Sequence, residues 1–181
     1  AEMDLQILNQ FANLTTVEVE PGGAHYSSVD NMICDAVGTT ILYAPKGVAG
    51  EYEIPRGIRE IGPSAFAYCT GLTKITIPNY INKIGDSAFL NGTGITEVIF
   101  EGSRKNDLLI DNKAFSGCDN IQTITFQGNN TGKKNAGVTT IGTSAFEGLN
   151  QLRTVIFENG TNIVIGQRAF AANEKLTNLT Y

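Results

Sequence analysis

The stretch IGPSAFAYCTGLTKITI, residues 61–77, recurs four more times along the chain with the same spacing of apolar residues. The other copies are IGDSAFLNGTGITEVIF from Ile84, IDNKAFSGCDNIQTITF from Ile110, IGTSAFEGLNQLRTVIF from Ile141 and IGQRAFAANEKLTNLTY from Ile165. Their phenylalanines, at positions 66, 89, 115, 146 and 170, are separated by 23, 26, 31 and 24 residues. Such a recurring unit is the sequence signature of a repeat protein.

The tail of each copy predicts a short strand, because its last residues alternate between apolar and polar and are rich in β-branched types. These tails are residues 73–77, 96–100, 122–126, 153–157 and 177–181. The Ala-Phe segment is too short for more than one or two helical turns. Glycine follows the first Ile in four copies and Asp111 takes its place in the third, a column that indicates a tight bend or a positive φ.

A unit of this length cannot bury its own apolar face, so we expect the copies to stack and to align their strands in a parallel sheet. The repeated Ile, Ala, Phe and Leu positions then form continuous internal columns. Cys69 and Cys118 fall in one such column, two copies apart, which is roughly 10 Å at the spacing of strands. That separation exceeds the reach of a disulfide, so buried free thiols are expected.

We treat residues 1–181 as one solenoid domain, with a divergent unit over residues 1–53 and five regular repeats over residues 54–181. Leu14–Val19 matches the strand half of the repeat and predicts an incomplete copy at the start. Residues 25–45 alternate short apolar runs with turn residues, including Asp30-Asn31, and predict one or two small hairpins.

The run I-P-x-x-I-x-x-I-G-x-x-A-F-x-x-C-x-x-L-x-x-I-x-I-P, read from Ile54 to Pro78, resembles the BspA-like leucine-rich repeat. Residues 26–45 resemble the variant unit of that family, although Asn31 stands where glycine is usual. The resemblance implies a right-handed leucine-rich repeat solenoid, β-rich, with one short parallel strand per repeat of about 23–31 residues and short helical turns at Ala-Phe. It also implies a secreted or surface-anchored protein of a host-associated bacterium or protist, with adhesive function and no catalytic residues.

Composition and motifs argue against several other functions. The net charge of −5 disfavours nucleic-acid binding, and no apolar run is long enough to cross a membrane. No metal, nucleotide or cofactor motif appears, so we expect no metal site and no cofactor. An enzyme hypothesis would rest only on His25 and Cys34, which share one segment. We therefore expect a non-enzymatic, secreted or cell-surface protein whose signal segment is absent from this chain.

Two candidate surfaces for a protein partner follow from the repeat. The first is the outward face of the predicted sheet, where Ile99 and Ile156 interrupt mostly polar columns; it comprises Lys74, Thr76, Glu97, Ile99, Thr123, Thr125, Arg153 and Ile156. The columns also contain Thr16, Glu18, Thr154, Asn178 and Thr180. The second is the edge carrying the insertions 101–109, 127–137 and 158–164, with positive charge at Arg104, Lys105, Lys133 and Lys134.

Both surfaces are also compatible with a chain that binds no protein partner there. A threonine-rich strand face is common on solvated sheets, and basic loop residues are often simply solvated. The two isoleucines could instead meet a second copy of the chain. A further alternative is a structural spacer without its own ligand, or a scaffold that self-associates through its terminal repeat.

Overall fold

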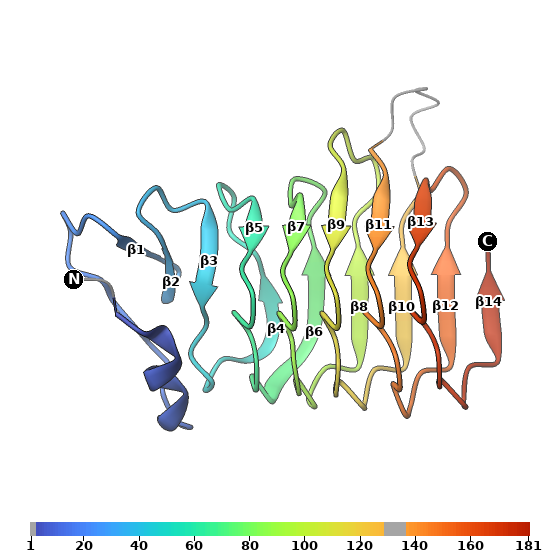
Figure 1. Cartoon of the computed structure of the whole chain (residues 1–181), viewed down its shortest axis with the longest axis horizontal. Helices are drawn as coiled ribbons and strands as arrows, with labels where there is room; N and C mark the ends of the chain where they lie inside the picture. Colours follow the sequence, from blue (N-terminus) through green and yellow to red (C-terminus); the bar gives the residue numbers. More distant parts are fainter. Residues whose placement is uncertain (1–2, 129–136) are drawn as a thin grey trace.

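The computed structural model describes residues 3–128 and 137–181, which form a solenoid of stacked coils running from one end of the molecule to the other (Figure 1). Each coil crosses two sheets, here called sheet A and sheet B, whose inner faces enclose the core. Within the described residues, sheet A contains β1 Tyr26–Val29, β2 Met32–Asp35, β3 Thr40–Tyr43, β5 Glu60–Ile61, β7 Lys83–Ile84, β9 Leu108–Ile110, β11 Thr139–Ile141 and β13 Ile163–Ile165. Sheet B contains β4 Ala49–Glu53, β6 Gly71–Ile77, β8 Glu97–Phe100, β10 Thr123–Phe126, β12 Thr154–Phe157 and β14 Asn178–Thr180.

Each regular repeat contributes two parallel strands, so the expectation of one strand per repeat was wrong. The strand at each repeat tail belongs to sheet B, as predicted. The additional strand precedes the glycine column and belongs to sheet A; an example is β7 Lys83–Ile84. These additional strands have only two or three residues, too few to show an alternating pattern in the sequence.

The predicted column of phenylalanines is present in the core. Adjacent rings of Phe66, Phe89, Phe115, Phe146 and Phe170 are stacked, with centroids 4.8 to 5.1 Å apart. The first four are fully buried. A second stack, formed by Phe100, Phe126 and Phe157 at the ends of sheet B strands, meets the first stack edge-on. The coils therefore seal one another's apolar interior.

The Ala-Phe segments are hydrogen-bonded turns, and the expected helical turns are absent from the described residues, where η1 Leu5–Gln10 is the only helix. The positive φ lies two residues after the glycine column, at Ser64, Ser87, Lys113, Ser144 and Arg168. It does not lie at the column itself, where a Cβ on Gly142 would come within 2.8 Å of the Ile110 carbonyl oxygen. The glycines thus permit close approach of neighbouring coils.

The start of the chain differs from its predicted form in one respect. β1 and β2 form the expected hairpin around Asp30 and Asn31, both at positive φ. Leu14–Val19, in contrast, forms no strand, and β4 lies beside β6 in the place expected for it. Consequently Thr16 and Glu18 are not part of the outward columns of sheet B.

The three cysteines are buried free thiols, as expected for Cys69 and Cys118. Burial raises the pKa of both of these thiols to about 12, which keeps them protonated at neutral pH. They act as small apolar residues of the core.

Candidate interaction surface

The outer face of sheet B brings most of the first candidate set together. Register places Lys74, Glu97, Thr123 and Thr154 side by side in one column. The neighbouring column contains Thr76, Ile99, Thr125, Ile156 and Thr180 in the same register. Arg153 is exposed and immediately precedes β12.

Ile99 and Ile156 are the apolar members of this second column. Both are partly buried, and Thr125 lies between them on β10. The order Thr-Ile-Thr-Ile-Thr across β6 to β14 makes a continuous stripe with alternating methyl-rich and hydroxyl-bearing side chains. Such a stripe offers apolar contact area to a partner without exposing a large contiguous apolar patch.

The charges next to the stripe are largely compensated. Lys74 Nζ lies 2.9 Å from Glu97 Oε2, and both side chains remain accessible. The hydrogen bond with Glu97 raises the pKa of Lys74, so the ammonium stays charged. Exposed pairs of this type add little stability and reorganise easily when a partner brings its own charges.

Arg104 does not lie at an exposed loop tip. Its assignment to the second candidate surface, the edge with the positively charged insertions, was therefore wrong. Its side chain is buried, and the guanidinium donates hydrogen bonds to the carbonyls of Ile81 at 2.7 Å, Pro78 at 3.2 Å and Ile77 at 3.3 Å. Burial lowers its pKa to about 10. Arg104 therefore holds one coil to the next.

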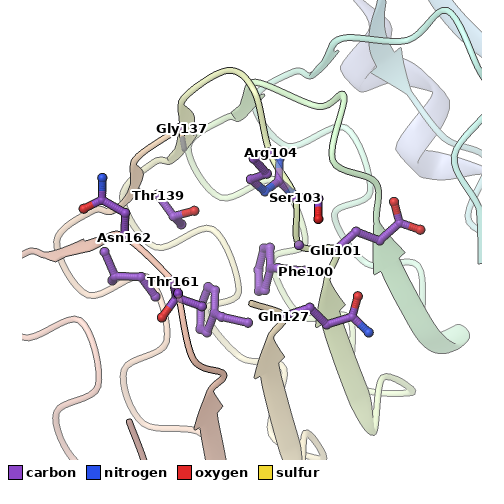
Figure 2. A pocket seen from close by; sticks show the side chains of 13 residues that line it. Phe100, Glu101, Ser103, Arg104, Gln127, Gly137, Thr139, Thr161 and Asn162 are labelled. Carbon is purple, nitrogen blue, oxygen red and sulfur yellow. The ribbon is translucent and has the colours of Figure 1, made fainter. Parts of the chain in front are cut away.

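Arg104 also borders a small cavity of about 20 Å³, large enough for one water molecule (Figure 2). Thr139, Asn162 and Phe100 line the same cavity, whereas the Glu101 side chain extends away from it (Figure 2). The cavity is too small for an organic ligand.

The remaining basic residues of the second candidate surface are Lys105, Lys133 and Lys134. Lys105 is exposed in the connection between β8 and β9. Lys133 and Lys134 lie outside the described residues. The connections that follow β8 and β12 leave the solenoid along one edge, as the position of these insertions predicted (Figure 1). Most of the insertion 127–137 lies outside the described residues.

Sequence reasoning missed two acidic residues that extend the sheet B columns. Glu51 pairs in register with Lys74, and Glu53 with Thr76; both glutamates are exposed. The spacing of 23 residues between Ile54-Pro55 and Ile77-Pro78 could have revealed them, because the same offset relates each glutamate to its partner.

An apolar column on the outer face of sheet A was missed as well. Leu109, Thr140 and Val164 lie side by side, with Leu109 38% and Val164 54% exposed. Three-residue strands gave no alternation from which this face could be recognised.

The geometry around Cys34 and His25 does not resemble a nucleophilic site. Cys34 is fully buried, and burial, reinforced by the nearby Asp35, raises its pKa to about 11. A catalytic cysteine needs an accessible thiolate. His25 is exposed and packs near Tyr26, with ring centroids 6.3 Å apart.

The described part of the chain shows neither a grouped metal site nor a membrane span. There, no three His, Cys, Asp or Glu side chains are grouped to hold a metal ion. No helix in residues 3–128 and 137–181 is long and apolar enough to cross a membrane.

Stacked two-sheet coils with a regular outer face define a repeat protein of the leucine-rich type. The chain belongs to the BspA-type leucine-rich repeat family, whose model matches six copies over residues 49–177. No curated protein sequence matches the chain.

Solved structures that share the fold include three with TM-scores above 0.5. A leucine-rich cell surface protein of Faecalibacterium prausnitzii is 21% identical with a TM-score of 0.64, covering 86% of this chain and 39% of its own. The Treponema pallidum leucine-rich repeat protein TpLRR is 21% identical with a TM-score of 0.57, covering 90% of this chain and 71% of its own. The pneumococcal vaccine antigen PcpA is 20% identical with a TM-score of 0.60, covering 92% and 45%. The chain thus spans less than half of the first and third relatives.

Proposed function

We propose that this chain is a non-enzymatic, extracellular protein-binding module that uses the outer face of sheet B. The observation that carries the proposal is the stripe in which Ile99 and Ile156 alternate with threonines in matched strand register. Membership of the BspA-type family, and a structural relative described as a cell surface protein, support a secreted or surface location. The partner class is a host matrix or surface protein.

The size of this face predicts weak single-site binding. Six strands about 4.8 Å apart, each about four residues long, give roughly 300–400 Å² per partner. This is well below the ~800 Å² per partner of a stable complex. We therefore expect adhesion to depend on several copies engaging one surface, which multiplies weak contacts into useful avidity.

The test compares the protein displayed at high density with Ile99→Asp and Ile156→Asp variants against a panel of matrix and cell-surface proteins. The expected result is loss of binding in both variants with an unchanged unfolding midpoint. Glu174→Gln, at an exposed position between β13 and β14, serves as the control outside both candidate surfaces. Equal binding by all variants would eliminate the sheet B face.

A self-associating scaffold is the alternative proposal, supported by the last coil. Ile165 and Leu179 are 54% and 58% exposed, and together with Phe157 and Tyr181 they line an apolar hollow of about 360 Å³. Light scattering over a concentration range, with Leu179→Asp as the disrupting variant, distinguishes this alternative. A constant molecular mass would exclude it.

A further inference from the structure

A hollow of about 510 Å³ lies at the edge of sheet B, where β4 and β6 end; Glu53, Arg56, Thr76, Asn79, Tyr80 and Glu101 line it. We propose that this edge hollow receives a lysine or arginine side chain of the protein that binds the sheet B face. The proposal rests on the proposed function and adds the chemistry of the partner. The hollow is large enough to hold either side chain together with water.

The edge hollow is continuous with the proposed binding face. Glu53 and Thr76 line the hollow and also belong to the outward column that continues with Ile99. One partner segment can therefore cover Ile99 with an apolar residue and direct a neighbouring long side chain over Thr76 into the hollow.

Charge favours a cation as the occupant. Glu53 is exposed and makes no ion pair within the described residues. Glu101 uses Oε2 to accept the Asn79 backbone N–H at 3.1 Å, which leaves acceptor capacity on its other oxygen. Arg56 is the one cation among the lining residues, so two carboxylates face a single guanidinium. The charges of the lining residues sum to −1, which favours a cation over an anion.

The same charged groups also shift the pKa of Tyr80. Burial, and next the Glu101 carboxylate, raise the pKa of Tyr80, while Arg56 and Arg59 act in the opposite direction. Arg59 lies over the Tyr80 ring at 5.6 Å, so its guanidinium is already engaged with this aromatic side chain. A cation entering from the sheet B side would meet the two carboxylates.

The wall of the hollow is held in place before any partner arrives. The turn after β6 is fixed by the Tyr80 hydroxyl, which donates to the Ile54 carbonyl at 2.6 Å, and by the Asn79 amide, which donates to the Gly102 carbonyl at 3.2 Å. Arg104 binds three carbonyls of the same turn. Such preorganisation lowers the entropy that binding must overcome.

A bare divalent ion is the weaker occupant, because the described residues bring no three metal-binding side chains together at this place. A protein side chain requires fewer carboxylate ligands than a metal ion, since water and carbonyl oxygens can complete its hydrogen bonding.

The test uses the peptide acetyl-Gly-Arg-Gly-amide as the probe and acetyl-Gly-Gln-Gly-amide as its neutral match, each titrated into the labelled protein and followed by amide NMR shifts. We expect the arginine peptide to move the Thr76, Asn79 and Tyr80 amides. Glu53→Gln should weaken that binding about fivefold, equivalent to about 1 kcal/mol. Glu60→Gln, a partly buried residue on sheet A, should leave it unchanged.

Equal shifts from the two peptides, no shift at these amides, or equal affinity of the wild type and Glu53→Gln would each overturn the proposal. This experiment needs no adhesion partner. Its failure therefore leaves the sheet B face to be judged by the Ile99 and Ile156 variants, and failure of those variants does not alter the peptide result.

Discussion

Replacing Arg104 with alanine is expected to lower the free energy of unfolding by about 2–4 kcal/mol. The guanidinium donates three hydrogen bonds to carbonyls of the preceding coil, and two of them are long, at 3.2 and 3.3 Å. A hydrogen bond from a charged group contributes roughly 1.5–3 kcal/mol, so we take the lower part of that range, roughly 5 kcal/mol in total. Burial lowers the pKa of Arg104 from 12.5 to about 10, so desolvation opposes this gain, and the Glu101 carboxylate offsets part of that cost.

The expected loss therefore lies below the hydrogen-bond total, and alanine additionally removes the packing of the side-chain stem. Arg104→Met separates these two effects, because it keeps an apolar stem and loses the hydrogen bonds. Urea unfolding followed by far-ultraviolet circular dichroism is the suitable assay, since the chain has no tryptophan. Lys105→Ala, an exposed neighbour, should stay within about 0.5 kcal/mol of the wild type.

A methionine variant as stable as the wild type would refute this reasoning, because the hydrogen bonds would then contribute nothing beyond the cost of burying the charge. Buried charges are known to be replaceable by apolar side chains at no cost when the two effects cancel. The experiment therefore has two clear outcomes.

Two further predictions concern the coil-to-coil contacts and the thiols. Gly142→Ala should destabilise the protein by roughly 1–3 kcal/mol in thermal unfolding, because the new Cβ would lie 2.8 Å from the Ile110 carbonyl oxygen. The change Thr143→Ala, at an exposed position, is its control. Equal stability of the two variants would contradict the close-approach argument. The three buried cysteines should resist a thiol-specific reagent at pH 8 and all react once urea unfolds the protein; a thiol that reacts rapidly in the native state would show that its coil opens.

The sequence was sufficient to predict the stacked repeat, the phenylalanine column and the five sheet B strands at the repeat tails, whereas β4 was missed. These features follow from apolar residues that recur at fixed positions, and burial imposes that recurrence on every coil. The sheet A strands of the regular repeats, β5, β7, β9, β11 and β13, were missed because two or three residues are too few to show a period of two. The glycine column was recognised, but its cause is close approach of neighbouring coils, a contact between residues far apart in sequence.

Arg104 shows how charge can mislead a prediction of exposure. It follows Phe100 by four residues, as Ile81 follows Ile77 and Ile58 follows Ile54, and both isoleucines are buried. The repeat register thus assigned this position to the interior, while residue type pointed to a loop tip. Register proved the better guide, since carbonyls of the preceding turn could accept the guanidinium hydrogen bonds.

The candidate surface was predicted only in part, because the repeat pattern describes the strands and not the contacts between their connections. Periodicity identifies which side chains point outward, and it gave the Ile99 and Ile156 stripe. It does not show which connections meet at the ends of the strands, so the hollow between Glu53 and Glu101 could be recognised only from the folded chain.

The most direct test of the stacked-coil account is a double-mutant cycle on neighbouring rings of the phenylalanine column. Phe115 and Phe146 are stacked with centroids 4.9 Å apart, whereas Phe66 and Phe146 are separated by two intervening rings. Leucine variants remove the rings while keeping apolar side chains. The account predicts a coupling free energy of about 0.5–1.5 kcal/mol for Phe115 and Phe146. For Phe66 and Phe146 it predicts a value within about 0.5 kcal/mol of zero, and equal coupling in the two pairs would contradict the account.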